Sequence, residues 1–370
     1  MAPELRCTPP APRGARLPSL AQTETTEDAE MRHAWMAAVL ALTFAGLHAG
    51  PAAAQDKPIE LRFSSWVGIG HGHHREVLVP WAKLIGEKSG GRLKVTIYPG
   101  GVLGKPADHW DLIKNGIADM GFGTHGYTPG RFPLTSVADL PLLYKSGKGG
   151  SQALWSIFDK HLKAEHADVK VLWIFVHPPG QIHMAKKPVH TPEDLAGLKL
   201  RAPTAVTVAI VKALGGTPVT LAAPETYNAL ERGVIDGTLF PWEAISGFKL
   251  AEVLRHHTVV NLYATSLFMT MNQKKYESLP PDLRKVIDDL SGAWGAEFTG
   301  AAWDKNEEEG MAAAKNAGAT IYAVPAAERA RWAAKLKPVE DEWITSMQSR
   351  GLPGREVLQD LREALQRYDR

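Results

Sequence analysis

The sequence predicts an α/β protein with two lobes, and three observations lead to this prediction. Strand-like and helix-like segments alternate from Ile59 onward. The same alternation starts again near Gln181, after the sequence Pro178-Pro179-Gly180. A later helical stretch, residues 280–316, is long enough to lie across two lobes. Alternating strands and helices are typical of sheets with helical crossovers, so we expect each half to form its own sheet.

The first half should contain strands and helices in alternation. We expect strands at 59–64, 93–98, 117–122 and 169–176, and helices at 77–88 and 107–116. Gly116 is suited to ending the second helix because glycine adopts the left-handed conformation without strain. The strand at 169–176 is apolar on both faces, which favours a central parallel strand.

The second half begins with a capped helical turn. Thr191 can cap it, Pro192 occupies the first helical position, and two acids follow in the first turn, as helix-end physics favours. We expect strands at 198–201 and 215–219, helices at 205–214 and 224–233, and then the long helix at 280–316. A short strand at 319–324 and further helices should complete the chain to Tyr368.

Residues 31–54 have the three parts of a secretory signal peptide. A cationic start at Met31-Arg32-His33 precedes an apolar stretch, 34–47, and then Ala52-Ala53-Ala54 before Gln55. The alternative is an apolar core helix, but nothing amphipathic marks a buried face. The Pro-, Arg- and Thr-rich residues before Met31 do not resemble a signal. We therefore expect Met31 to be the true start and residues 1–54 to be absent from a periplasmic mature protein.

Composition excludes several classes of protein. Of 370 residues, 44% are hydrophobic and 22% charged, which is ordinary for a folded soluble protein. Lys and Arg total 42 against 40 Asp and Glu, so the charge does not suggest a nucleic-acid partner. The single cysteine, Cys7, precedes Gln55, so the expected mature chain can form no disulfide. No segment after Ala54 approaches the roughly 18 apolar residues of a membrane span.

One glycine motif matches a dinucleotide-binding pattern by its letters alone. Residues 121–126 read GFGTHG, as in GxGxxG. That motif requires a helix starting at the loop, whereas Pro129 and Pro133 follow within a few residues. The candidate acidic residue, Asp139, also comes too early. We interpret the glycines as room for backbone to approach a ligand or the other lobe, and expect no cofactor.

His71, His73 and His74 are candidate zinc or nickel ligands, which leaves a metal-dependent hydrolase as the enzyme alternative. A metal site would need their rings to converge with a fourth group. Gly70 and Gly72 instead predict a mobile loop entering a helix. Residues 161–166 miss the HxxEH zinc-hydrolase spacing by one position, and no GxSxG, P-loop or HExxH motif occurs. We therefore expect neither a bound metal nor an enzyme.

Arg201 has the strongest functional signal. It ends an apolar strand two residues before Pro203, so its guanidinium points either into solvent or into the crevice where strand ends meet. Ligands of open α/β sheets bind in that crevice. A guanidinium can hold a carboxylate through two parallel hydrogen bonds.

Seven segments, in this order and spacing, resemble the DctP-type extracytoplasmic solute receptors of tripartite ATP-independent periplasmic (TRAP) transporters. The resemblance covers residues 57–350. Its carriers are WAKLIGEKSGGRLKVTIYP (81–99), LG (103–104), LIKNGIAD (112–119), ADLP (138–141), TPEDLAGLKLR (191–201), LGGTP (214–218) and YNALERGVIDG (227–237).

The resemblance implies a Venus-flytrap fold, with crossing strands at 176–184 and 259–270 and a long helix across both lobes. We expect lobe I to comprise 55–180 and 267–306, and lobe II 181–266 and 307–370 with the C-terminal helices. It also implies that Arg201 clamps a carboxylate and that the partner is an ion-driven membrane permease. A receptor serving an ATP-driven importer or a sensor kinase is the alternative within binding proteins.

Departures from the family pattern concern the ligand. Sialic-acid and dicarboxylate members often have a second arginine near Gln181 and an asparagine near Phe240. One clear cation with several aromatic rings favours a small hydrophobic or aromatic monocarboxylate, with a dicarboxylate or sugar acid as the alternative. The predicted ligand-binding residues are Arg201, Gln181, Trp66, His125, Tyr127, Phe240, Trp242 and Glu243.

Overall fold

Two β-sheets organise residues 57–370, which this computed structural model describes together with Met31. The predicted signal segment and its cleavage after Ala54 lie outside the described residues. In the part of the chain that the structure describes, no helix combines the length and the apolar character needed to cross a membrane.

The first sheet has five strands in the order β2-β1-β3-β10-β4. Its strands are β1 (Ile59–Ser64), β2 (Leu93–Tyr98), β3 (Met120–Thr124), β4 (Lys170–Val176) and β10 (Ser266–Met271). Strand β1 runs parallel to β2 and β3, whereas β10 is antiparallel to β3 and β4. We call this sheet lobe I, together with helices α2 (Val79–Lys88), α3 (His109–Lys114), α4 (Gly147–Ser156), α8 (Gln273–Glu277) and α9 (Pro281–Asp289).

The second sheet has six strands in the order β11-β9-β5-β8-β6-β7. Its strands are β5 (Gly180–Met184), β6 (Lys199–Arg201), β7 (Thr217–Val219), β8 (Gly237–Phe240), β9 (His256–Tyr263) and β11 (Thr320–Ala323). We call it lobe II, together with α5 (Ala205–Ala213), α6 (Thr226–Glu231) and α7 (Glu243–Gly247). The predicted α/β fold with two lobes is confirmed.

Two predictions about individual elements were wrong. Strand β4 is an edge strand antiparallel to β10, not a central parallel strand. Its residues are nevertheless apolar because α4 and α10 (Gly292–Asn316) cover it. The expected single helix 280–316 is interrupted between α9 and α10, where Leu290 and Ser291 leave helical geometry and Gly292 has φ 64°.

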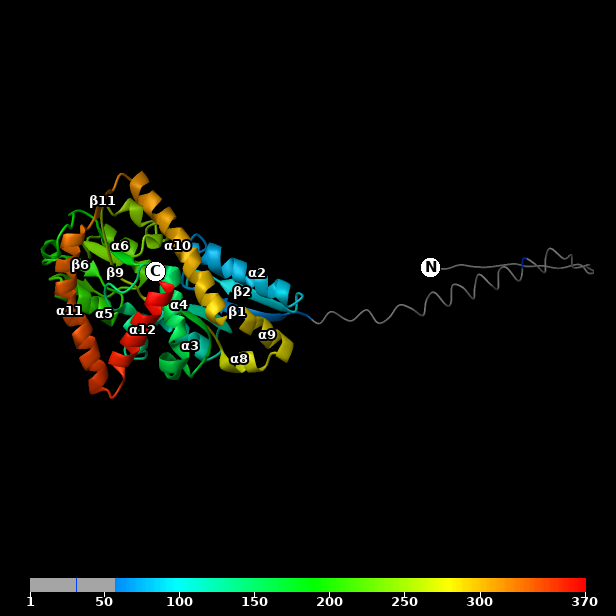
Figure 1. Ribbon diagram of the computed structural model, residues 1–370. Helices are drawn as coiled ribbons and strands as arrows, with labels where there is room; N and C mark the ends of the chain where they lie inside the picture. The colour runs from blue at the N-terminus through cyan, green and yellow to red at the C-terminus, as the bar shows by residue number, and fades with distance from the viewer. Residues whose placement is uncertain (1–30, 32–56) are drawn as a thin grey trace, which may run out of the picture. The chain divides into compact units, whose positions relative to one another are not determined.

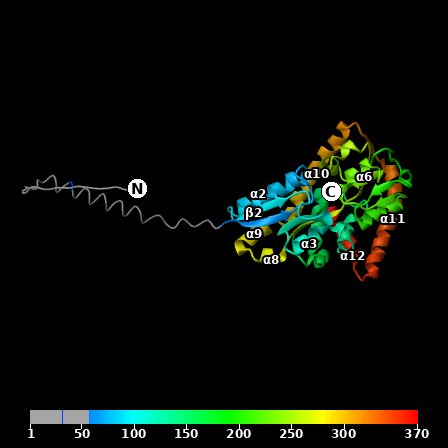
Figure 2. The same cartoon turned by 180° about the vertical axis from the view of Figure 1, so that it is seen from behind.

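Helix α10 contacts both lobes, packing on α4 of lobe I and on α7 of lobe II (Figure 1). Helix α11 (Ala326–Ser349) then packs on α5, and α12 (Gly354–Tyr368) returns to α4. Figure 2 shows α2, β2 and α9 at one end of residues 57–370 and α6 and α11 at the other. The C-terminal helices therefore also connect the two lobes.

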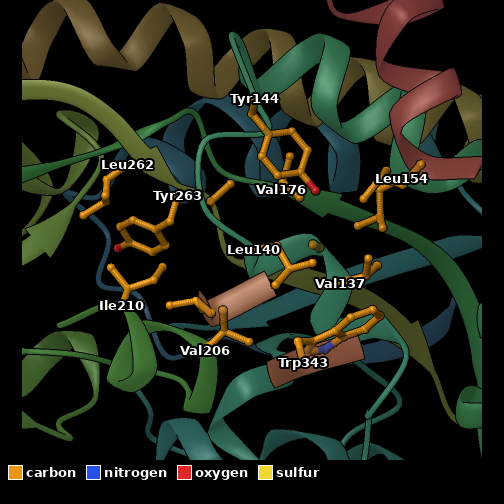
Figure 3. Packing of buried hydrophobic residues seen from close by; sticks show 14 of the residues in the cluster. Val137, Leu140, Tyr144, Leu154, Val176, Val206, Ile210, Leu262, Tyr263 and Trp343 are labelled. Atoms are coloured by element: carbon orange, nitrogen blue, oxygen red, sulfur yellow. The ribbon is translucent and has the colours of Figure 1, made fainter. Parts of the chain in front are cut away.

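The chain passes between the sheets along the segments expected to cross. Strand β4 of lobe I leads into β5 of lobe II, and β9 of lobe II leads into β10 of lobe I. Buried residues of both lobes pack together beside these crossings, including Tyr144 and Val176 with Leu262 and Tyr263 (Figure 3).

Candidate ligand-binding site

A cavity of about 40 Å³ lies where strand ends of the two lobes meet. Trp66 and Tyr127 follow β1 and β3 of lobe I, while Arg201 and Phe240 end the parallel strands β6 and β8 of lobe II. This is the crevice at the carboxyl ends of strands where α/β proteins bind ligands. The cavity is also lined by His71, Thr124, His177, Pro203, Ala223, Pro241, Glu243, Ala244, Phe248, Tyr263, Thr265, Leu267 and Trp303.

Arg201 is buried, with 2% of its surface exposed, and three hydrogen bonds fix its guanidinium. Nε donates to the carbonyl of Leu221 at 3.1 Å, Nη1 to the carbonyl of Leu239 at 3.2 Å, and Nη2 to the hydroxyl of Tyr127 at 3.2 Å. The ring of Phe240 lies 4.0 Å from Cζ. Since a guanidinium has five N–H groups, one N–H on each terminal nitrogen remains to donate to an anion.

The charge of Arg201 lacks a protein counter-ion. Among residues 57–370, no Asp or Glu oxygen lies within 4.0 Å of its guanidinium nitrogens. A buried charge is costly unless it is paired. His177 adds no second cation, because burial, with a further contribution from the charge of Arg201, lowers its pKa to about 4. The site is therefore suited to one anionic group.

Tyr127 extends the anion-binding group of Arg201. Its hydroxyl accepts from Nη2 of Arg201 and from the backbone N–H of Ala223, at 2.9 Å. Both of its acceptor positions are then used, so its own hydrogen is available to donate. Tyr127 comes from lobe I and Arg201 from lobe II. The donors for a carboxylate are thus complete only when the lobes are together.

Aromatic rings form the walls of the cavity. Trp66 of lobe I and Phe248 of lobe II are parallel within 4°, with centroids 6.4 Å apart. A flat ring stacked between them would need about 7 Å, because carbon atoms contact at about 3.5–4.0 Å. The lobes would therefore have to separate before a planar ring could lie between these two aromatic faces.

His71 and Glu243 form a second polar group at the cavity and also come from opposite lobes. Nδ1 of His71 lies 2.9 Å from Oε1 of Glu243, and each side chain is 2% exposed. The backbone N–H of Glu243 donates to Glu307 at 2.8 Å. Burial raises the pKa of Glu307 to about 8, so this neighbour is largely neutral at pH 7. Glu243 is the carboxyl group that lines the cavity.

The structure brings five of the eight predicted residues to the cavity: Trp66, Tyr127, Arg201, Phe240 and Glu243. The other three, Gln181, His125 and Trp242, lie elsewhere. Gln181 joins the crossing strands, because its amide donates to Pro179 and Asn261 while its oxygen accepts from the backbone N–H groups of Val260 and Asn261.

His125 and Trp242 are occupied by packing. His125 pairs with His166 at 2.9 Å and lines a separate cavity of about 360 Å³ beside α5 and α11. The indole of Trp242 packs against His183 and His257. Neither chemical type nor position in the sequence distinguished these two residues from the ones at the cavity.

Sequence reasoning missed His177, Phe248, Tyr263, Thr265 and Trp303 at this cavity. Phe248 comes directly after α7, the short helix that begins at the predicted residue Glu243. Trp303 lies in α10, far along the chain, and only the tertiary fold brings it to the site.

His71 and His73 are buried and His74 is half-buried, contrary to the prediction of a mobile loop. His73 accepts from the indole N–H of Trp303 at 2.9 Å, and burial lowers its pKa. Among the described residues, the cluster of three potential metal ligands is elsewhere, at His161, Glu356 and Asp360. Lys160 forms ion pairs with both Glu356 and Asp360, and this shared cation explains why the two carboxylates lie close together.

Gly126 confirms the interpretation of the glycine motif as room for close approach. A Cβ at Gly126 in lobe I would lie 2.2 Å from Cγ2 of Thr204 in lobe II. A Cβ at Gly123 would meet Phe268 at the same distance. Glycine is therefore required at these two positions, where the lobes and strands touch.

Residues 63–346 match the model of the bacterial extracellular solute-binding proteins of family 7, DctP. The chain is similar to a TRAP solute-binding protein from Rhodoferax ferrireducens with copurified benzoate, at 33% identity and TM-score 0.82. That match covers 84% of this chain and 98% of the other.

Two further solved structures are similar. A marine metagenome TRAP protein specific for aromatic acids, in complex with 3-hydroxybenzoate, is 35% identical with TM-score 0.83, over 85% of this chain and all of the other. A TRAP protein from Bordetella bronchiseptica with bound (R)- and (S)-mandelate is 31% identical with TM-score 0.79, over 84% of this chain and all of the other.

Proposed function

The chain belongs to the bacterial extracellular solute-binding proteins of family 7, and we propose that it binds an aromatic monocarboxylate in the periplasm and delivers it to a TRAP membrane permease. It is a TRAP-type solute-binding protein. The ligand, the periplasmic destination and the permease partner are the proposed parts.

The observation that carries the proposal is the buried guanidinium of Arg201 without a carboxylate partner among the described residues. Leu221, Leu239 and Tyr127 hold it so that one N–H on each terminal nitrogen is left for a ligand. Two parallel N–H groups fit one carboxylate. His177 supplies no second cation for a second carboxylate, since it is neutral at pH 7.

The aromatic walls support a flat ligand body. Trp66 and Phe248 approach a planar ring from opposite lobes, and Phe240 continues this surface to Arg201. Benzoate, 3-hydroxybenzoate and mandelate, which occur in the three similar structures, each combine one carboxylate with one aromatic ring. We infer the same class of ligand for this chain.

Delivery requires the lobes to open. A cavity of about 40 Å³ is far below the several hundred Å³ typical of ligand pockets. The contacts Tyr127–Arg201 and His71–Glu243 both cross between lobes, so entry of an acid must break them. Hinge motion at the crossing segments near 176–184 and 259–270 would do so.

Isothermal titration calorimetry with benzoate, succinate and glucuronate tests the proposed ligand class. We expect benzoate to bind most tightly of the three. Saturation at about 100 times the dissociation constant should also stabilise the protein by roughly 2.7 kcal/mol in thermal unfolding. Tighter binding of succinate or glucuronate would contradict the aromatic assignment and leave the family assignment intact.

Export and transport have separate tests. Mass spectrometry of the periplasmic protein should find an N-terminus near Gln55, and an exported chain that begins at Met1 would contradict the proposed signal. Uptake of the bound acid should require a TRAP permease. Uptake that persists without it and depends on ATP would instead favour an ATP-driven importer.

A further inference from the structure

We propose that Glu243 accepts a hydrogen bond from a hydroxyl group of the ligand, so that the ligand is a hydroxylated aromatic monocarboxylate. This inference rests on the proposed function and specifies its ligand class. Glu243, oriented by His71, is then the residue that distinguishes a hydroxylated acid from its unsubstituted parent. The same carboxylate also excludes a second carboxylate from this end of the cavity.

The first observation is a buried carboxylate that keeps unused acceptor positions. Glu243 is 2% exposed and lines the cavity. Among the described residues, the one ionisable nitrogen within 4.0 Å of its carboxylate is Nδ1 of His71, which lies 2.9 Å from Oε1 and donates to it when that nitrogen carries the ring proton. A carboxylate has about four acceptor positions, so this single donor leaves positions for a ligand.

A buried carboxylate with unused acceptor positions is unfavourable, and a ligand hydroxyl fills one of these positions. A carboxylate accepts short and strong hydrogen bonds from O–H groups. It cannot donate when ionised, so it selects ligands that bring a donor. A fluorine or a second carboxylate at the same place brings none.

The second observation is the position of Glu243 relative to Arg201. Phe240 lies against the guanidinium of Arg201 at 4.0 Å, and the ring of Phe248 follows at 5.9 Å between centroids. Phe248 in turn lies 4.9 Å from the ring of His71. Two aromatic rings therefore separate the anion-binding group from the His71–Glu243 pair. A ligand ring over this wall would carry its carboxylate at one end and its hydroxyl at the other.

The third observation is that helix α7 leaves room for the pair. A Cβ at Gly247 would lie 2.9 Å from Cδ2 of His71 and 3.2 Å from Oε1 of Glu243. Both distances are shorter than ordinary contacts. The close packing of His71 against α7 thus depends on glycine one turn after Glu243.

The test compares matched ligands by titration calorimetry. 3-Hydroxybenzoate is compared with 3-fluorobenzoate, and 4-hydroxybenzoate with 4-fluorobenzoate. Each fluoro acid has nearly the same shape as its hydroxy partner but no hydrogen-bond donor on the ring. We expect at least one hydroxy acid to bind tenfold or more tightly than its fluoro partner, because sites built around a ligand hydroxyl strongly reject analogues that lack it.

Two variants separate the acceptor from the charge. Glu243→Leu removes the acceptor, and the hydroxy/fluoro ratio should fall below threefold. Glu243→Gln keeps an acceptor and loses the charge, so binding of isophthalate should improve at least threefold relative to benzoate. Glu308→Gln, an exposed position of α10, is the control and should change neither ratio.

Equal wild-type affinities for each hydroxy/fluoro pair would overturn the inference, even if the leucine variant does not fold. A ratio that Glu243→Leu leaves unchanged would overturn it too. In both cases tight fluorobenzoate binding would keep the proposed function standing. If none of the benzoates binds, the proposed function and this inference both fail.

Discussion

The hydroxyl of Tyr127 lies 3.2 Å from Nη2 of Arg201, and this hydrogen bond joins the two lobes at the candidate ligand site. It places a third donor beside the two N–H groups that Arg201 retains. The arrangement couples carboxylate binding to closure, because Tyr127 reaches Arg201 only when the lobes meet.

Replacement of Tyr127 by phenylalanine tests this coupling. The substitution removes one donor and leaves Arg201 and the N–H of Ala223 without their acceptor. Hydrogen bonds to charged groups contribute about 1.5–3 kcal/mol, so benzoate should bind roughly 10- to 100-fold more weakly. Titration calorimetry measures this loss, and Tyr322→Phe in β11 is the control. An unchanged affinity would show that Tyr127 does not hold the acid.

Gly126 offers a test of closure that leaves the ligand contacts intact. An alanine there would bring Cβ to 2.2 Å from Thr204 of the other lobe. We expect Gly126→Ala to weaken benzoate binding at least tenfold, because the strain arises in the closed state. The control is Gly68→Ala, where a Cβ would meet nothing within 4 Å.

Small-angle scattering provides the second measurement for this variant. Wild-type protein should contract on saturation with benzoate, and Gly126→Ala should contract less at equal occupancy. Contraction to the same extent, with the same affinity, would exclude Gly126 as a closure contact.

Buried histidines predict loss of stability in acid. Burial lowers the pKa values of eight described histidines: those of His166, His177 and His257 to about 4, those of His73, His125 and His183 well below their ordinary value, and those of His74 and His109 as well. The unfolded chain binds these protons near pH 6.5. The contribution of these neutral histidines to the free energy of unfolding is therefore present above pH 6.5 and is lost as the pH falls toward 4.

Four carboxyl groups act in the opposite direction. Burial raises the pKa of Asp139 to about 7 and that of Glu307 to about 8, and it also raises the pKa values of Glu165 and Asp304, so protonation of these groups stabilises the fold as the pH falls. The eight histidines outweigh the four carboxyls between pH 6.5 and 5. At about 1.4 kcal/mol per pH unit for each net proton, we expect the free energy of unfolding to fall by about 3 kcal/mol or more between pH 7 and pH 5.

Urea unfolding at the two pH values measures this change. His257→Gln should lose less stability between pH 7 and pH 5 than wild type, whereas His190→Gln, at an exposed position, should match wild type. A free energy of unfolding that stays constant or rises toward pH 5 would contradict the assignment of neutral buried histidines.

Much of the fold could be predicted from local pattern, and the errors have physical causes. Strands β1 and β2 were predicted at their observed limits because alternating side chains and glycine-rich ends mark them. The edge position of β4 was not predictable, because an apolar strand covered by α4 and α10 has the same composition as a central one. The break before α10 depends on Leu290 and Ser291, which are compatible with helix.

The candidate site was predictable where a residue ends a strand. Arg201, Phe240 and Trp66 follow this rule, and all three line the cavity. Gln181 does not line the cavity, since its amide group is hydrogen-bonded within the crossing strands. These hydrogen bonds depend on the backbone conformation of Asn261, where φ is 54°. The pairing of His71 with Glu243 joins residues of opposite lobes and could not be derived from sequence spacing.

The affinity of benzoate for Arg201→Ala, measured by titration calorimetry against wild type, tests the central claim most directly. Loss of one partner of a buried charged pair commonly costs about 2–5 kcal/mol, so binding should weaken at least tenfold. Arg201→Lys should also bind clearly more weakly, because lysine keeps the charge and loses the planar pair of donors. A folded Arg201→Ala protein that binds benzoate within a factor of two of wild type would contradict the account.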